Sequence, residues 1–204
     1  MKYNLGCGGH LPDGWVNVDY ALGARLSKLP IFKLINKKLG LFNIDWNDKI
    51  FIHDLTTEFP WETNSADVVY SSHTLEHMSK KDGRYFLEES FRILKKGGIL
   101  RIVVPDLGRT IDEYLSGRLN ADDFVIELDV LYTESGSYVK NKLSPLFQYP
   151  HKCMYDTKAL LRIFNEIGFT AKSCEPFVSE IESIGNIENK ERANNAVIVE
   201  GVKL

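Results

Sequence analysis

Histidines and acidic residues that can move a proton or hold a metal ion occur at two places in the sequence. One is the segment His73-Thr74-Leu75-Glu76-His77, and the other is His151, which precedes the acid Asp156. Histidine exchanges a proton near neutral pH, so it can deprotonate a hydroxyl that attacks an electrophilic carbon. We therefore take His73 and His151 as candidate catalytic residues, with a packing or surface role as the alternative for each.

The first of these segments also contains the HxxEH spacing of some zinc hydrolases. On a helix this spacing places both histidines on one face, and a catalytic zinc then needs a third protein ligand, for which His53 and His151 are available. A strand is expected to run up to Ser71, however, so the helical context of that motif is missing. We predict no metal site here, and we expect Glu76 and His77 to pack at the start of a helix.

A glycine-rich turn, Gly6-Cys7-Gly8-Gly9, follows the first apolar segment of the chain. Without a Cβ atom, such a turn lets the backbone approach a ligand closely, although a tight turn without a ligand remains the alternative. The full GxGxxG pattern of dinucleotide dehydrogenases is broken by Leu11, which disfavours that class of enzyme.

Polar residues end the next strands in an order that suits an adenosyl ligand. Asp19 ends a second predicted strand, where a carboxylate can accept both ribose hydroxyls. Asp54 and Leu55 follow a third strand, where the acid can accept from an adenine amino group and the leucine can pack on the ring. Ser71 ends the fourth strand.

Short apolar segments alternate with helical patterns, which predicts an α/β fold with a largely parallel sheet and helices on both faces. Strands are expected near Lys2–Leu5, Trp15–Val18, Ile50–His53, Asp67–Ser71, Ile99–Val104, Thr170–Glu175 and Ala196–Val202. Helices are expected at Lys80–Lys95, capped by Ser79 and stopped by Gly97-Gly98, and at Lys158–Ile167, capped by Asp156 or Thr157 and ended by Gly168.

The chain resembles the class I methyltransferases, particularly the methyltransferase type 11-like group. Asn4-Leu5-Gly6-Cys7-Gly8 looks like their first motif, and the segments 67–77 and 94–100 look like their fourth and fifth motifs. The resemblance implies a Rossmann-like, seven-stranded sheet with the last strand antiparallel, and S-adenosylmethionine as cofactor. It also implies cofactor contacts from Asn4, Gly6, Cys7, Gly8, Asp19, Asp54, Leu55 and Ser71.

This sequence departs from the family pattern in two respects. Family members usually carry an acid where Asn4 stands. Asp19 follows Gly8 by only eleven positions, which is too short for the usual strand–helix–strand crossover. We expect the first helix to be reduced to a turn, unless Asp19 is not the ribose ligand.

Two long segments fit no core element, and we predict that they form the acceptor pocket. Residues 21–43 mix lysines with large apolar side chains and suit a packed amphipathic helix, a cover over the substrate or contact with a membrane surface. Residues 107–150 supply aromatic side chains for the walls: Tyr132, Tyr138, Phe147 and Tyr149.

The composition favours one cytoplasmic domain, residues 1–204, with insertions near 21–48 and 107–150. The chain has 204 residues, is 44% hydrophobic and carries a net charge of −3, so no nucleic-acid partner is expected. Three scattered cysteines fit a reducing compartment, and no signal peptide or membrane span is evident.

The residues thus predict a methyltransferase that uses S-adenosylmethionine to modify a small-molecule or carbohydrate-type acceptor. The main alternative is a noncatalytic adenosyl-binding or regulatory protein of the same fold, and the HxxEH zinc hydrolase comes third. The sequence leaves the acceptor atom and the oligomeric state open.

Overall fold

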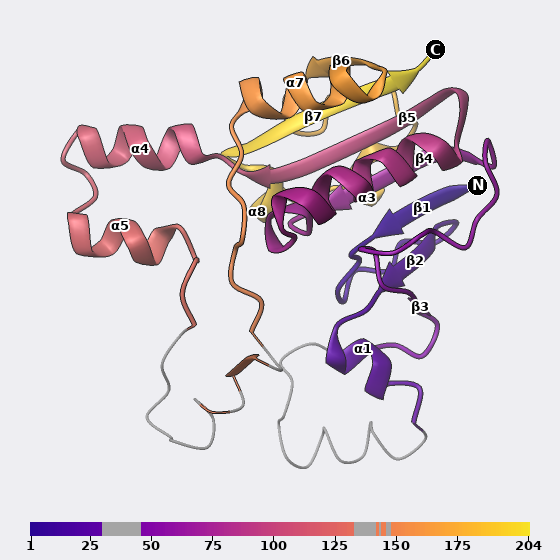
Figure 1. Ribbon diagram of the computed structural model, residues 1–204, viewed down its shortest axis with the longest axis horizontal. Coiled ribbons are helices and arrows are strands. Elements are labelled where there is room, and N and C mark those ends of the chain that lie inside the picture. The colour runs from indigo at the N-terminus through magenta and orange to yellow at the C-terminus, as the bar shows by residue number, and fades with distance from the viewer. Residues whose placement is uncertain (30–45, 133–141, 143, 146–147) are drawn as a thin grey trace.

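The computed structural model describes residues 1–29, 46–132, 142, 144–145 and 148–204 (Figure 1). Its sheet has seven strands: β1 (Lys2–Leu5), β2 (Val16–Asp19), β3 (Phe51–Ile52), β4 (Ala66–Ser72), β5 (Leu94–Pro105), β6 (Phe169–Ser173) and β7 (Ala196–Lys203). All of the predicted strands are present, and β5 is longer and β3 shorter than expected.

The strands lie in the order β3-β2-β1-β4-β5-β7-β6, which confirms the predicted Rossmann-like sheet. Strands β1 to β5 pair in parallel, whereas β7 runs antiparallel between β5 and β6. The carboxyl ends of the five parallel strands therefore meet at one edge of the sheet, which we call the carboxyl edge. Ligands of open α/β sheets bind at this edge.

Helices cover both faces of the sheet, as predicted. Helices α3 (Lys80–Ile93) and α7 (Thr157–Ile167) lie side by side on one face, and α8 (Lys190–Ala193) lies behind the sheet (Figure 1). The short turn η2 (Ile184–Asn186) joins α8 in a second apolar cluster with residues of β4 and β5. The sheet is thus buried from both sides, as its apolar strands require.

The predicted caps of α3 and α7 are confirmed, but the predicted end of α3 is not. Ser79 accepts a hydrogen bond from the Asp82 amide, Asp156 accepts one from the Ala159 amide, and Gly168 ends α7 at φ +116°. The prediction that α3 continues to Lys95 is wrong. Leu94 already pairs with β4, and Gly97, at φ +80°, lies where the register between the two strands shifts.

No helix separates β1 from β2, which confirms that the first helix is reduced to a turn. Residues 6–15 return to the start of β2, so Tyr3 pairs with Val16 and Leu5 with Val18. The chain therefore passes from the glycine turn to β2, which ends at Asp19, without an intervening helix.

The two long segments both begin at the carboxyl edge. Helix α1 (Leu22–Leu26) follows β2, while α4 (Leu107–Leu115) and α5 (Ala121–Glu127) follow β5 and extend away from the sheet (Figure 1). Residues 30–43, which make up most of the segment 21–43, lie outside the described residues. Tyr138 and Phe147 also lie outside them. Within the described part of the chain, no helix has the length and apolar character needed to cross a membrane.

A buried ion network ties β5 to the C-terminal part of the sheet. The guanidinium of Arg101, on β5, lies 2.8 Å from each carboxylate oxygen of Glu188 and 2.9 Å from Glu200 on β7. It also donates to the carbonyls of Val178 and Glu175. Burial opposes the charged form, but the two carboxylates raise the pKa of Arg101 above its ordinary value.

Candidate active site

The glycine turn lies at the carboxyl edge, held against the ends of β2 and β4. The amides of Gly6 and Cys7 both donate to the Val18 carbonyl, at 2.9 and 3.0 Å. At Gly6, which has φ +75°, a Cβ atom would lie 2.0 Å from Thr74 Oγ1, so close approach of the chain after β4 requires glycine there. At Gly8, which has φ +55°, a Cβ atom would meet nothing within 4 Å. The space beside Gly8 is therefore open to a ligand.

Asp19 organises this turn. Its carboxylate accepts from the Gly8 amide and from the Ala21 amide, each at 2.8 Å, and the residue is 9% exposed. A carboxylate has about four acceptor positions, so capacity remains for a ligand hydroxyl. Asn4 also shapes the turn, because its amide donates to the His10 carbonyl and to Asn17 Oδ1.

The third strand end lies beside the second. The His53 amide donates to the Asp19 carbonyl at 3.3 Å, which places Asp54 close to Asp19 along the carboxyl edge. One Asp54 oxygen accepts from the amide and hydroxyl of Thr56, forming a tight turn. Leu55 is 6% exposed and packs in the main core. Most of its surface therefore contacts the protein itself.

Beyond β4 the chain turns sharply. The Ser71 hydroxyl is buried and makes no hydrogen bond among the described residues. His73 follows at φ +52°, and Thr74 Oγ1 lies 3.4 Å from the Gly6 carbonyl oxygen. Thr74, which the sequence analysis did not single out, thus contacts the glycine turn where the ends of β1 and β4 adjoin.

His73 is fixed by both ring nitrogens. Nε2 donates to the Arg192 carbonyl at 3.0 Å, and Nδ1 lies 3.3 Å from Glu76 Oε1. Burial opposes charge on the ring, but Glu76 and the Arg192 carbonyl together raise the pKa of His73 above its ordinary value. A histidine held in this way is a poor general base, because neither nitrogen offers a free lone pair.

His151 has the opposite arrangement. Its Nδ1 lies 2.8 Å from the Leu128 carbonyl oxygen and therefore carries the proton, which leaves the Nε2 lone pair for an acceptor or a cation. The backbone beside it is anchored, because the amides of Lys152 and Cys153 both donate to the Glu76 carbonyl. The structure thus brings His151 to the end of β4 from a distant part of the chain.

Three possible metal ligands meet at this point. Glu76 and His77, in the single turn η1 (Leu75–His77), and His151 each offer an atom within 4.8 Å of the others. Burial lowers the pKa of His77, which favours its neutral ring. His73 is not a member of this group, so the ligand set differs from the HxxEH pair of histidines on one helix, which the sequence analysis disfavoured. Sequence reasoning missed the group, because only the fold reveals how His151 approaches Glu76.

The described parts of the two long segments also meet at the carboxyl edge. The Tyr149 hydroxyl accepts from the Leu22 amide at 3.1 Å, and Ala24 of α1 belongs to a small apolar cluster with Cys7. Tyr132 is half exposed. Tyr149 therefore links residues 107–150 to the segment after Asp19, and a place in a pocket wall stays a prediction for both Tyr149 and Tyr132.

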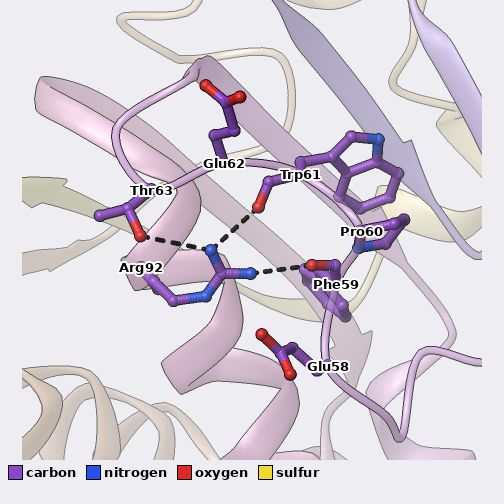
Figure 2. A pocket seen from close by; sticks show the side chains of 7 residues that line it. All are labelled: Glu58, Phe59, Pro60, Trp61, Glu62, Thr63 and Arg92. Atoms are coloured by element: carbon purple, nitrogen blue, oxygen red, sulfur yellow. Dashed lines mark hydrogen bonds between the residues drawn. The ribbon is translucent and has the colours of Figure 1, made fainter.

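A separate pocket lies near the opposite edge of the sheet (Figure 2). It is lined by residues 58–63 and Arg92, which donates to the carbonyls of Phe59 and Trp61. Arg92 also pairs with Glu89 at 2.8 Å, and this pairing lowers the pKa of Glu89. Its donors are occupied in holding the chain before β4, so we assign this pocket a structural role.

Solved structures share this fold over nearly the whole chain. YcgJ protein from Bacillus subtilis is 12% identical with a TM-score of 0.53, covering 99% of this chain and 91% of that one. A SAM-dependent methyltransferase from Methanosarcina mazei is 14% identical with a TM-score of 0.54, covering 100% and 92%. An O-methyltransferase family protein from Burkholderia thailandensis is 13% identical with a TM-score of 0.51, covering 99% and 50%. No curated protein sequence matches the chain.

The sheet order, the antiparallel β7 and the glycine turn after β1 define the fold of the class I methyltransferases. A family model described as a methyltransferase domain matches residues 4–102 of this chain. This match over residues 4–102, together with the shared fold, supports a methyltransferase that uses S-adenosylmethionine as cofactor.

Proposed function

We propose that this methyltransferase modifies a small-molecule or carbohydrate-type acceptor bound between the glycine turn and His151. The observation that carries the proposal is that one segment, residues 74–76, contacts both the glycine turn and the backbone beside His151. Thr74 touches the glycine turn on one side, and Glu76 binds the backbone beside His151 on the other. A methyl donor and an acceptor held on these two sides would face each other.

The glycine turn and the strand-end acids would hold the cofactor. Gly6, Cys7, Gly8 and Ser71 would line its methionine part, Asp19 would accept from the ribose hydroxyls, and Asp54 and Leu55 would contact the adenine, with Asn4 shaping the turn. S-adenosylmethionine supplies an electrophilic methyl group on a sulfonium that leaves readily. The protein must therefore mainly align the acceptor and deprotonate it, and alignment alone can supply several kcal/mol of the barrier.

His151 would supply a ring nitrogen for the acceptor. Its Nδ1 proton is committed to the Leu128 carbonyl, so Nε2 can accept a proton from an attacking hydroxyl. His73, with both nitrogens engaged, would position Glu76 rather than touch the acceptor. A noncatalytic adenosyl-binding protein would share the cofactor contacts and lack turnover, so product formation separates the two functions.

S-adenosylhomocysteine should bind the purified chain with one-to-one stoichiometry and raise its melting temperature, because a ligand that binds only the folded state stabilises it by mass action. Calorimetry and a thermal-shift assay measure the two effects. Absence of both heat and melting shift at millimolar ligand would contradict the proposal.

Asp19→Ala should weaken S-adenosylhomocysteine binding by about 1.5–3 kcal/mol, the usual loss for a hydrogen bond to a charged group. Part of the loss would come from the turn, because the Gly8 and Ala21 amides lose their acceptor. Asp54→Ala should cost less, since its carboxylate is more exposed to water. Calorimetry on the two variants tests this order, and unchanged affinity in Asp19→Ala would place the ribose elsewhere.

A further inference from the structure

Glu76 is a buried acid whose charge is poorly balanced by the protein. Its side chain is 1% exposed, and neither carboxylate oxygen makes a hydrogen bond among the described residues. The nearest nitrogens, His73 Nδ1 at 3.3 Å and His151 Nε2 at 4.0 Å, both face Oε1. A buried carboxylate without donors is costly, so such a group is normally paired or bound to a cation. His73 can balance part of the charge at Oε1, and Oε2 has no hydrogen-bond partner in the part of the chain that the structure describes.

The imidazoles of His77 and His151, both beside Glu76, are arranged as metal ligands. The Leu128 carbonyl fixes the proton of His151 on Nδ1, the usual way in which a backbone carbonyl orients a ligating histidine. The ring of His77 lies 5.0 Å from that of His151, centroid to centroid. The Asp129 carboxylate adds a fourth group, with Oδ2 at 3.8 Å from His151 Nε2.

We propose that Glu76, His77 and His151 bind a divalent transition-metal ion. One carboxylate and two imidazoles suit Zn²⁺ or Co²⁺ better than Mg²⁺, which prefers oxygen ligands and water. Ligand bonds of about 2.0–2.2 Å hold neighbouring ligand atoms about 3–4 Å apart, so the 4.8 Å spread closes with small side-chain rotations. A site with three protein ligands keeps at least one position open.

The place of this site gives the ion a role, which rests on the proposed function. Glu76 follows two residues after Thr74, which touches the glycine turn, so the open position would lie near the transferred methyl group. A cation there lowers the pKa of an acceptor hydroxyl, and His151 would act on the acceptor through the ion rather than directly. The hydroxyl proton would pass to Asp129 or water. The oxygen of the acceptor hydroxyl would then form a bond to the methyl carbon while the bond between that carbon and sulfur breaks. The electron pair of the broken bond would stay on sulfur. The acceptor class is therefore a hydroxyl compound, favoured where a second oxygen lies beside the hydroxyl.

The test uses the full chain stripped of metal by a chelator and then titrated by calorimetry with ZnCl₂ and with CoCl₂, whose visible absorption reports the ligand set. We expect one ion per chain. Glu76→Gln and His151→Ala should each weaken binding at least tenfold, on the order of the loss from removing a ligand or its support. His73→Ala is the matched comparison: it removes a histidine that supports Glu76 but none of the three ligands, and it should weaken metal binding less than His151→Ala.

The outcomes separate this site from its alternatives. No binding, or binding that Glu76→Gln and His151→Ala leave unchanged, would overturn the proposal. Loss of the ion in His73→Ala as severe as in His151→Ala would favour the HxxEH arrangement instead. Circular dichroism identifies any variant that fails to fold, and either ligand variant alone then decides. Titration of S-adenosylhomocysteine into the same stripped chain distinguishes failure of the metal site from failure of the proposed function.

Discussion

Gly8→Ala is expected to bind S-adenosylhomocysteine at least about tenfold more weakly than the wild-type chain. A Cβ atom at Gly8 meets nothing within 4 Å in the protein, so the atom it disturbs would belong to the cofactor. Inserting a methyl group into a close contact costs about 1–3 kcal/mol, and 1.4 kcal/mol corresponds to tenfold in affinity. The free energy of unfolding should fall only by the strain of alanine at φ +55°, about 1–2 kcal/mol. Calorimetry and urea denaturation measure the two quantities.

Gly14→Ala provides the matched control. Gly14 also has a positive φ, +79°, and a Cβ atom there also meets nothing within 4 Å. It lies just before β2, at the edge of the sheet opposite the glycine turn, so the variant should show comparable backbone strain without loss of cofactor affinity. Equal affinity in the two variants would show that the open space beside Gly8 does not receive the cofactor.

Arg101→Met is expected to lower the free energy of unfolding by about 3–5 kcal/mol, the usual loss when one member of a buried ion pair is removed. Methionine fills much of the same volume, but Glu188 and Glu200 then lose their shared cation while remaining buried. Urea denaturation measures the change. Adding Glu188→Gln and Glu200→Gln should restore part of the stability, because the two uncompensated charges are then removed.

The exposed pair Lys172–Glu180, in the same part of the fold, serves as the control. Lys172→Met should change stability far less, because water solvates the remaining carboxylate. A loss in Arg101→Met no greater than in Lys172→Met would contradict our view that the Arg101 network is a buried electrostatic unit.

The strands and the two helices α3 and α7 could be predicted because each has a local signal. These signals depend only on residues that are close in sequence. They are the apolar runs of strand length, the helix caps at Ser79 and Asp156, and the helix end at Gly168. The end of α3 was misjudged because Gly97-Gly98 reads equally well as a helix stop and as a kink in a strand. Pairing of Leu94 with Ala66 decides between them, and a contact between distant residues leaves no mark in the local pattern.

The candidate site was predicted only where strand ends position it. Gly6 directly follows β1, Asp19 is the last residue of β2 and Ser71 is the next to last of β4, so the order of the sheet fixes their places. Arg101 looks in the sequence like one polar interruption of an apolar strand, and its carboxylates come from positions 188 and 200. Likewise, His151 follows a long segment with weak patterning. Nothing local indicates that its ring reaches Glu76.

The antiparallel strand β7 imposes an order on folding. Strand β6 pairs in the sheet with β7 alone, and β5 faces β7 on the side away from β4. Until residues 196–203 are in place, β5 is therefore an open edge with unpaired amides and carbonyls, and β6 has no neighbour to join. Contacts of such long sequence separation form late and slowly. A nascent chain that ends before Ala196 would thus present β5 as a template for pairing with other chains, so aggregation should compete with folding until β7 inserts.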